Sequence, residues 1–195
     1  GLANAKRLGC TIKNEEVIGI SFLNSLAVET TAGVYEGDVV ILATGASRAT
    51  PKIDGLLRLE GRGISYCAIC DAFFYRGKTV AVIGNGEYAL HEAQTLLPVV
   101  GSVTMLTNGA PLEVEVPDSI SVDTRKIVSI DGEDVVTGVT FADGEKRAVD
   151  GVFVAIGVAS SADLARKLGA LTEGNRIVAN ENGETNIPGL YAAGD

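Results

Sequence analysis

Several residue types are scarce in this sequence, and each shortage disfavours a class of chemistry. The 195 residues include three Cys, one His (His91) and no Trp. Three Cys are too few for a disulfide scaffold, and one His leaves almost no material for a multi-histidine metal site or a Ser-His-Asp triad. The cysteine usage is typical of the reduced cytoplasm, where a close Cys pair is catalytic or binds metal.

Long apolar runs and positive charges are also scarce. No run approaches the roughly 18 apolar residues that span a bilayer, and no charged leader precedes an apolar stretch, so we expect neither membrane insertion nor secretion. The net charge of −9, from 16 basic and 25 acidic residues, disfavours a nucleic-acid partner. Glycine is abundant, at 24 positions, within a composition that is otherwise ordinary for a globular protein.

The order of predicted elements indicates an α/β fold. Apolar runs predict buried strands at 79–83, 102–107 and 151–157, and a helix at 87–97 that Pro98 ends. The first two strands and this helix form a βαβ unit, which requires a parallel sheet. Short strands are expected within 11–44 and 113–150. The consecutive apolar positions of 38–43 predict a strand that is covered on both faces.

A glycine-rich turn lies between the strand at 79–83 and the helix. Gly84, Gly86 and Ala89 match the pattern G-x-G-x-x-A, in which the glycines permit a tight turn and a close approach to pyrophosphate, and the small third residue permits close packing. The acidic or basic residue expected about 20 positions later for the ribose is missing. Nucleotide binding and a turn that binds nothing therefore both remain open.

Cys67 and Cys70 form a CxxC motif that Asp71 follows directly. Two thiols at this spacing can close a small disulfide ring, and a carboxyl group beside them could exchange a proton with the leaving thiolate. Zinc binding, with Cys10 and His91 as the remaining ligands, and two buried structural thiols are the alternatives. Redox chemistry is favoured. Cys10 is expected to be a structural thiol and His91 a surface or packing residue.

These motifs together resemble the low-molecular-weight thioredoxin reductases, which are flavin-dependent pyridine nucleotide-disulfide oxidoreductases. The segments that carry the resemblance are 43–46, 61–71, 73–76, 84–89, 154–157 and 187–195. It implies a Rossmann-like three-layer nucleotide-binding domain inserted into part of an FAD domain. The corresponding ranges are 1–54 and 158–195 for the partial FAD domain and 55–157 for the inserted NAD(P)-binding-like domain.

The resemblance also implies roles for individual residues. Cys67 and Cys70 would be the redox disulfide and Asp71 its acid, with electrons passing from a donor to FAD, to the disulfide, and then to thioredoxin or a similar protein. The inserted domain rotates in this family, and its members are usually homodimers. Candidate cofactor-binding residues are Thr44, Gly45, Gly84, Gly86, Ala89, Ile156, Gly157, Gly194 and Asp195, of which Thr44, Gly45, Gly194 and Asp195 correspond to FAD contacts.

The sequence departs from the family pattern in two ways. A first strand with its own glycine turn for the FAD pyrophosphate, and a helix beyond the terminal Gly-Asp, are not in these 195 residues. We therefore expect a piece of a longer chain or a truncated relative, without tight FAD binding as it stands. The Arg residues that grip the NADPH 2′-phosphate are replaced by Thr107, Asn108, Gly109 and Glu113.

The loss of these cations makes NADPH or NADH a weakly supported donor, because a carboxylate near a phosphate repels it. Relatives that accept electrons from ferredoxin share this kind of loss. The leading hypothesis is a flavin-dependent disulfide reductase, possible donors including ferredoxin. The alternatives are a dithiol oxidase that acts on a small-molecule dithiol and a non-catalytic module that keeps the fold.

Overall fold

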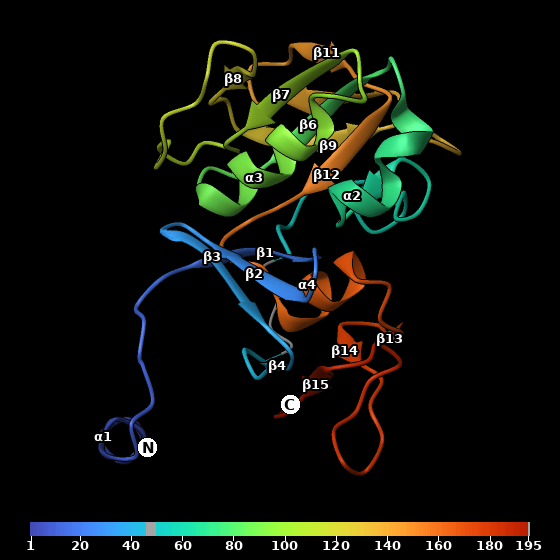
Figure 1. Ribbon diagram of the computed structural model, residues 1–195. Helices are drawn as coiled ribbons and strands as arrows, with labels where there is room; N and C mark the ends of the chain where they lie inside the picture. Colours follow the sequence, from blue (N-terminus) through green and yellow to red (C-terminus); the bar gives the residue numbers. More distant parts are fainter. Residues whose placement is uncertain (46–49, 195) are drawn as a thin grey trace.

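The structure is a computed structural model that describes residues 1–45 and 50–194. The chain forms two lobes, one above the other in Figure 1, with an N-terminal arm that extends away from both. The chain passes between the lobes twice, between β4 (Val40–Leu42) and β5 (Ile64–Ser65), and between β12 (Gly151–Val154) and α4 (Ser161–Lys167).

The upper lobe, called the parallel-sheet lobe here, contains β5 to β12. Its central sheet has the order β5-β12-β6-β7-β8, and each neighbouring pair in it is parallel. The helix α3 connects β6 to β7, as the glycine turn and the apolar runs predict. The remaining elements of this sheet and its helices are β6 (Thr79–Ile83), α3 (Glu87–Leu96), β7 (Ser102–Leu106), β8 (Ser121–Asp123), α2 (Ala68–Asp71) and the 3₁₀ helix η1 (Ala72–Tyr75).

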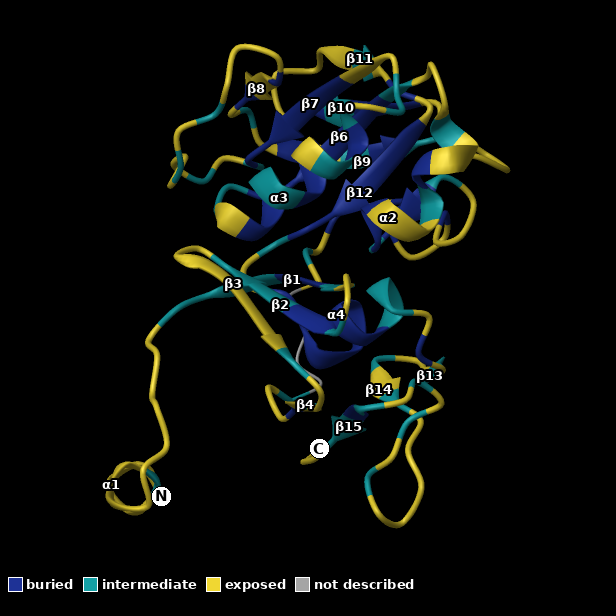
Figure 2. Cartoon of the chain, in the orientation of Figure 1, coloured by how far each residue is buried: buried dark blue, intermediate teal, exposed yellow. Residues whose placement is uncertain are grey.

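The parallel sheet is the middle layer of three. Val80 and Val82 of β6 belong to a buried cluster with α3, whereas Ala81 and Ile83 belong to a second cluster with an antiparallel sheet, because successive side chains of a strand point to opposite faces. That antiparallel sheet has the order β11-β10-β9. Its strands are β9 (Ile127–Asp131), β10 (Gly138–Phe141) and β11 (Lys146–Ala148). The predicted α/β architecture with a parallel sheet is confirmed, and its central strands are the darkest part of Figure 2.

The lower lobe, called the split lobe here, is built from two segments of the chain. The first segment forms an antiparallel meander and β4, and the second forms α4, a short hairpin and a strand that pairs with β4 in parallel. These strands are β1 (Val17–Phe22), β2 (Leu26–Thr30), β3 (Gly33–Gly37), β13 (Thr172–Glu173), β14 (Arg176–Ile177) and β15 (Leu190–Ala192).

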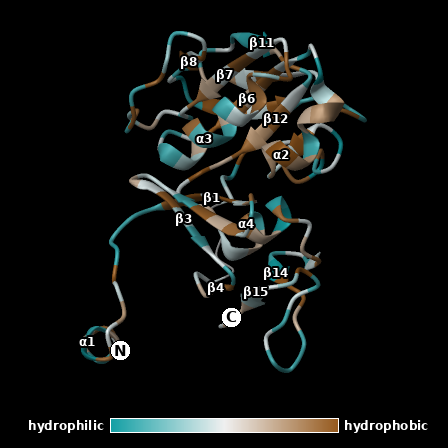
Figure 3. Ribbon diagram, viewed as in Figure 1, coloured by the Kyte–Doolittle hydropathy of each residue, from teal (hydrophilic) through white to brown (hydrophobic). Residues whose placement is uncertain are grey.

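Two predictions about this part of the chain are wrong. The strand expected within 38–43 is only three residues long, and Val39 and Ile41 are 57% and 63% exposed, because β4 pairs with β15 alone and no described segment packs on its outer face. Cys10 is exposed rather than a packed structural thiol, since it follows α1 (Leu2–Arg7), a helix without buried residues on the arm. Figure 3 shows apolar side chains on both lobes. None of the described helices has the length and apolar character needed to cross a membrane.

Candidate functional site

The CxxC motif lies at the start of α2, on the side of the parallel-sheet lobe that faces the split lobe. Cys67 is the N-cap of this helix, so the next turn brings Cys70 back over it, with 5.3 Å between their Cα atoms. The two residues form a disulfide. Cys67 is buried, whereas Cys70 is exposed. The pairing leaves neither thiol available for zinc in this oxidised form.

Asp71 is held by a serine that the sequence reasoning missed. The Ser65 hydroxyl on β5 donates a hydrogen bond to Asp71 Oδ2 at 2.6 Å, and it accepts the backbone N–H of Cys67 at 3.1 Å. Ser65 is itself buried. It therefore fixes the carboxylate relative to the disulfide, and its place two residues before Cys67 is the sole sequence signal for that role.

A cavity of about 530 Å³ joins the disulfide to the split lobe. Cys67, Cys70 and Asp71 line it from one side, and Arg166 and Asn175 line it from the other. The sulfur of Cys70 lies 3.7 Å from the backbone carbonyl oxygen of Arg166 on α4. A protein partner therefore cannot reach this face of the disulfide while α4 occupies it, although a flat small group has room there.

Three of the predicted FAD contacts meet at the edge where β4 and β15 end. Thr44 Oγ1 lies 2.6 Å from Ser161 Oγ at the start of α4, and Gly45 and Gly194 line a cavity of about 280 Å³ beside it. The carboxyl ends of parallel strands meet at one edge of a sheet, which is where open α/β sheets bind ligands. Asp195 lies outside the described residues.

The residues at this edge fit part of a flavin site. Gly45 and Gly194 have φ of +78° and +98°, and a Cβ atom at either position would have no neighbour within 4 Å, so the backbone is open to a ligand. Thr44 also lines a second cavity, of about 730 Å³, together with Ile156 and Gly157. The sequence-predicted residues Thr44, Ile156 and Gly157 are thus brought together from both lobes.

The predicted nucleotide turn is formed, but packing explains much of it. A Cβ atom on Gly84 would lie 2.1 Å from the carbonyl oxygen of Ala155 and 2.5 Å from the side chain of Ala89, so this glycine is required by the contact of β6, β12 and α3. Gly86 is the N-cap of α3 and has no side-chain cap. The carboxylate of Glu113 would lie 3.6 Å from a Cβ atom there.

Acidic side chains surround this turn. Glu16, Glu87 and Glu113 line one cavity of about 180 Å³ with Gly86, and the Glu113 N–H donates to the backbone carbonyl of Asn85 at 2.9 Å. Partial burial, followed by the charges of Glu87 and Glu113, raises the pKa of Glu16. The local potential is therefore unfavourable for a pyrophosphate.

The positions where the family carries its phosphate-gripping cations serve the fold instead. The Thr107 hydroxyl donates to the carbonyl of Ala110 at 2.7 Å, and Asn108, at φ +53°, accepts the N–H of Ile127 on its side-chain oxygen at 2.9 Å. Both side chains close the turn after β7 rather than face a ligand.

A dinucleotide-type parallel sheet that presents a CxxC disulfide to a second lobe defines the class of two-lobed disulfide oxidoreductases. The comparison with known proteins agrees: the profile of the pyridine nucleotide-disulphide oxidoreductase family matches residues 9–195, and the chain belongs to this family. Within it, the similarity is to thioredoxin reductases.

Sequence and structure comparisons identify individual relatives. A thioredoxin reductase of Aquifex aeolicus is 35% identical over 176 residues, which cover 83% of this chain and 54% of that protein. An atypical thioredoxin reductase, TRi, of Desulfovibrio vulgaris Hildenborough has a TM-score of 0.92 at 36% identity, covering 100% of this chain and 69% of that one. A ferredoxin-flavin thioredoxin reductase of Clostridium acetobutylicum has a TM-score of 0.64 at 30% identity, covering 100% of this chain and 67% of that one.

The curated relatives include a protein with another activity. A component of the alkyl hydroperoxide reductase of Staphylococcus epidermidis is 32% identical over 176 residues, covering 83% of this chain and 35% of that protein. The chain thus spans about half the length of the Aquifex aeolicus relative and about a third of the Staphylococcus epidermidis relative.

Proposed function

We propose that this chain is the disulfide-bearing part of a flavin-dependent reductase that reduces thioredoxin or a similar protein disulfide. The observation that carries the proposal is the Cys67–Cys70 disulfide, which lies with the Asp71 carboxylate in a cavity shared by two lobes. A non-catalytic module has no need for this arrangement, nor for the buried serine that orients Asp71. The division into 1–54, 55–157 and 158–195 belongs to the same proposal.

In the proposed reaction the Cys67 and Cys70 thiols lose two electrons and two protons to a partner disulfide. One thiolate attacks a partner sulfur, which forms a mixed disulfide and releases one partner thiolate; the second Cys then displaces the other. The products are the Cys67–Cys70 disulfide and a partner dithiol. Asp71, oriented by Ser65, would move the proton between the Cys pair and water.

The electron pair that regenerates the dithiol would come from FAD. Thr44, Gly45, Gly157 and Gly194 would hold the cofactor, with Ile156 beside them, and Asp195 is retained as a candidate from its motif. A bound flavin supplies two-electron chemistry that amino-acid side chains lack. The open backbone at Gly45 and Gly194 supports this assignment.

The apolar surface beside the disulfide supports a protein partner. Ile69 within the CxxC motif and Phe73 and Phe74 on η1 are each more than half exposed. An exposed cluster of large apolar side chains next to a redox centre is typical of a protein-docking surface rather than of a small-molecule site. Thioredoxin-like proteins are therefore favoured over a small-molecule dithiol, whose oxidation is the weaker alternative.

The electron donor is proposed to be something other than NADPH or NADH. Glu16, Glu87 and Glu113 surround the turn of Gly84, Gly86 and Ala89, and Thr107 and Asn108 are engaged in turn contacts. Both features oppose a bound nucleotide phosphate. The similarity to a ferredoxin-flavin thioredoxin reductase favours ferredoxin as the alternative. A homodimer and a cytoplasmic location are further proposals, from the family resemblance and the cysteine usage respectively.

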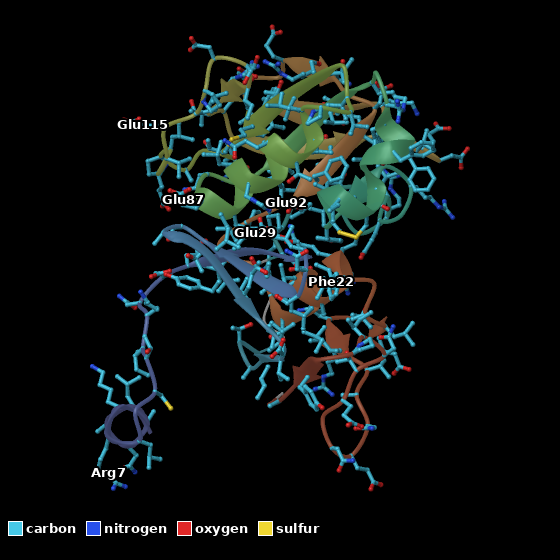
Figure 4. The ribbon with its side chains drawn as sticks, in the orientation of Figure 1. Arg7, Phe22, Glu29, Glu87, Glu92 and Glu115 are labelled. Atoms are coloured by element: carbon cyan, nitrogen blue, oxygen red, sulfur yellow. A yellow bond between two sulfur atoms is a disulfide. The ribbon has the colours of Figure 1, made fainter. Side chains whose placement is uncertain are left out.

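An anaerobic titration of the flavoprotein, expressed from its complete reading frame, tests this function. We expect NADPH to bleach the flavin absorption slowly, and the Glu113→Ala variant to bleach faster because one charge beside the pyrophosphate position is removed. Glu115→Ala, an exposed neighbour labelled in Figure 4, is the matched control and should behave as the parent. Fast bleaching of the parent protein by NADPH would overturn the proposal about the donor, and failure of the reduced protein to reduce thioredoxin would overturn the proposal about the partner.

A further inference from the structure

One carboxylate connects the redox helix to both lobes. Glu92 of α3 is almost fully buried, and its Oε2 accepts the backbone N–H of Ala68 at 2.7 Å. Ala68 follows Cys67 and is the first residue of α2. The other oxygen of Glu92, Oε1, is paired with the ammonium group of Lys167. Glu92 therefore holds the disulfide helix with one oxygen and the neighbouring lobe with the other.

Lys167 comes from the split lobe. It is the last residue of α4, and its side chain is 4% exposed while that of Glu92 is 2% exposed. The adjacent residue, Arg166, contributes the carbonyl oxygen that faces Cys70. The ion pair and the contact that covers the disulfide are thus made by consecutive residues of one helix turn, so loss of one would disturb the other.

The rest of this seam, defined as the contact of α3 with β1, β2 and α4, is close but weakly charged. His91 Nε2 lies 3.9 Å from Glu29 Oε2, and a Cβ atom on Gly19 would lie 3.0 Å from both of these atoms. Figure 4 shows Glu29 and Glu92 on the two sides of the seam. Burial, followed by the charge of Lys167, lowers the pKa of His91, so near neutral pH this ring is uncharged. Glu92 with Lys167 is therefore the charged contact on which the seam depends most.

A buried ion pair between two lobes is suited to a reversible contact. Each charge recovers water when the lobes separate, which offsets the attraction that is lost, whereas a single buried charge without its partner is strongly unfavourable. The chain crosses between the lobes at two places, which leaves relative movement of the lobes possible.

We propose that Glu92 and Lys167 form a charge latch that positions the Cys67–Cys70 disulfide against the split lobe and, on opening, exposes it to a protein partner. The proposal deepens the proposed function and rests on it for the identity of that partner. Both residues are positioning residues, since neither touches a reacting sulfur atom in the structure.

A set of four variants separates the latch from a purely structural role. Lys167→Met leaves Glu92 buried without its partner, and Glu92→Gln removes the charge but keeps an oxygen for the Ala68 N–H. The double variant removes both charges together. Lys146→Met is the matched control, because Lys146 faces Asp131 at 4.0 Å in an exposed pair of the parallel-sheet lobe, with a side chain that is 73% exposed.

The first measurement is acylation of lysine amines by an N-hydroxysuccinimide ester, followed by peptide mass spectrometry. We expect Lys167 of the parent protein to react at least about tenfold more slowly than Lys146, and the Glu92→Gln change to raise its rate by about tenfold while Lys146 is unaffected. Equal rates for the two lysines in the parent protein, or no change in Glu92→Gln, would overturn the latch. This measurement does not depend on the partner.

The second measurement compares reduction of the disulfide by a large excess of reduced thioredoxin with reduction by a small phosphine. The ratio of the two rates should rise by about tenfold in Lys167→Met, stay unchanged in Lys146→Met, and return to within about twofold of the parent in the double variant. That return is a rescue that simple destabilisation would not produce. An unchanged ratio in Lys167→Met, or additive effects in the double variant, contradicts the latch.

The two measurements also separate the latch from the proposed function. If thioredoxin reduces the disulfide of no variant while Glu92→Gln still frees Lys167 for acylation, the proposed partner is wrong and the latch stands. If Lys167→Met does not fold, Glu92→Gln and the double variant still report on the pair, because neither leaves a buried charge without an acceptor on α2.

Discussion

The two lobes differ in how completely they bury their apolar side chains. In the parallel-sheet lobe, β6 and β12 are covered on both faces, and Phe153 of β12 packs edge-on against Tyr75 at 5.3 Å between ring centroids. In the split lobe, Phe22, Val39 and Ile41 are more than half exposed. The first lobe closes its core with elements from one continuous segment, whereas the second is assembled from two segments around a two-stranded parallel pair.

The difference indicates where stability and chemistry are divided. The closed lobe provides a rigid platform for α2 and the disulfide. The split lobe contributes α4, the cavity edges and the ion-pair partner of Glu92, which are contacts at its surface rather than in its core. Changes within the closed lobe should therefore alter folding, and changes at the seam should alter function.

The largest effect is expected from removing a redox sulfur. Cys70→Ser should lower thioredoxin reduction by about a thousandfold or more, because the second displacement cannot occur, while the melting temperature changes little. A coupled thioredoxin assay measures the first and calorimetry the second. Cys10→Ser is the matched control and should keep full activity; residual reduction by Cys70→Ser near the parent rate would exclude the disulfide mechanism.

A paired truncation tests the contrast between the lobes directly. Phe153→Ala should lower the free energy of unfolding by about 3–5 kcal/mol, because it opens a cavity beside Tyr75 in a closed core. Ile41→Ala should cost less than about 1 kcal/mol, since the side chain is 63% exposed. Denaturant titrations of both variants give these values. A large cost for Ile41→Ala would show that β4 is covered in solution and would break the comparison.

A smaller effect is expected from the charged cluster of the closed lobe. Hydrogen bonds from Arg125 are the main cause that lowers the pKa of Asp123 from 3.8 to about 2. The folded state therefore binds its proton less readily than the unfolded state, so the contribution of Asp123 is complete above pH 3.8 and is lost as the pH falls toward about 2. Asp123→Asn should lower the unfolding free energy at neutral pH by about 1 kcal/mol, after screening by water around its Arg partners, and flatten this pH dependence. Thermal melts at stepped pH values would show it; an unchanged profile would contradict the ion pairs.

The smallest effect concerns His91 at the seam. Its lowered pKa means that the unfolded chain takes up the proton first, so the unfolding free energy should fall as the pH drops below about 6.5, and should be unaffected above it. His91→Gln should remove this dependence, which we expect to be below about 1 kcal/mol. Chemical denaturation across this pH range measures it. Greater stability of the parent at the lower pH would mean that Glu29 dominates the environment of His91 instead.

Local patterns predicted the elements with the strongest periodicity. The apolar runs at 79–83 and 102–107, the helix between them and the hairpin signal at Asp143-Gly144 all correspond to observed elements, because their hydrogen bonds and burial are decided by neighbouring residues. The exposed face of β4 was not predictable in this way, since an apolar run does not state how many neighbours its strand will have.

The candidate site divides in the same manner. Cys67, Cys70, Asp71 and the glycine turn are visible as motifs, and the disulfide and the turn are present where their spacing places them. Ser65 and the pair of Glu92 with Lys167 were not found, because a lone Ser, Glu or Lys carries no motif and the ion-pair partners are 75 residues apart.

The sequence by itself therefore determined the α/β class, the βαβ unit and the redox motif, because each depends on chemistry within a short stretch of chain. The tertiary structure decided which side chains hold that motif and what lies opposite it. Burial and charge pairing arise only when distant segments meet: Glu113 comes to lie beside Gly86, and Lys167 reaches Glu92 at the helix that carries the disulfide.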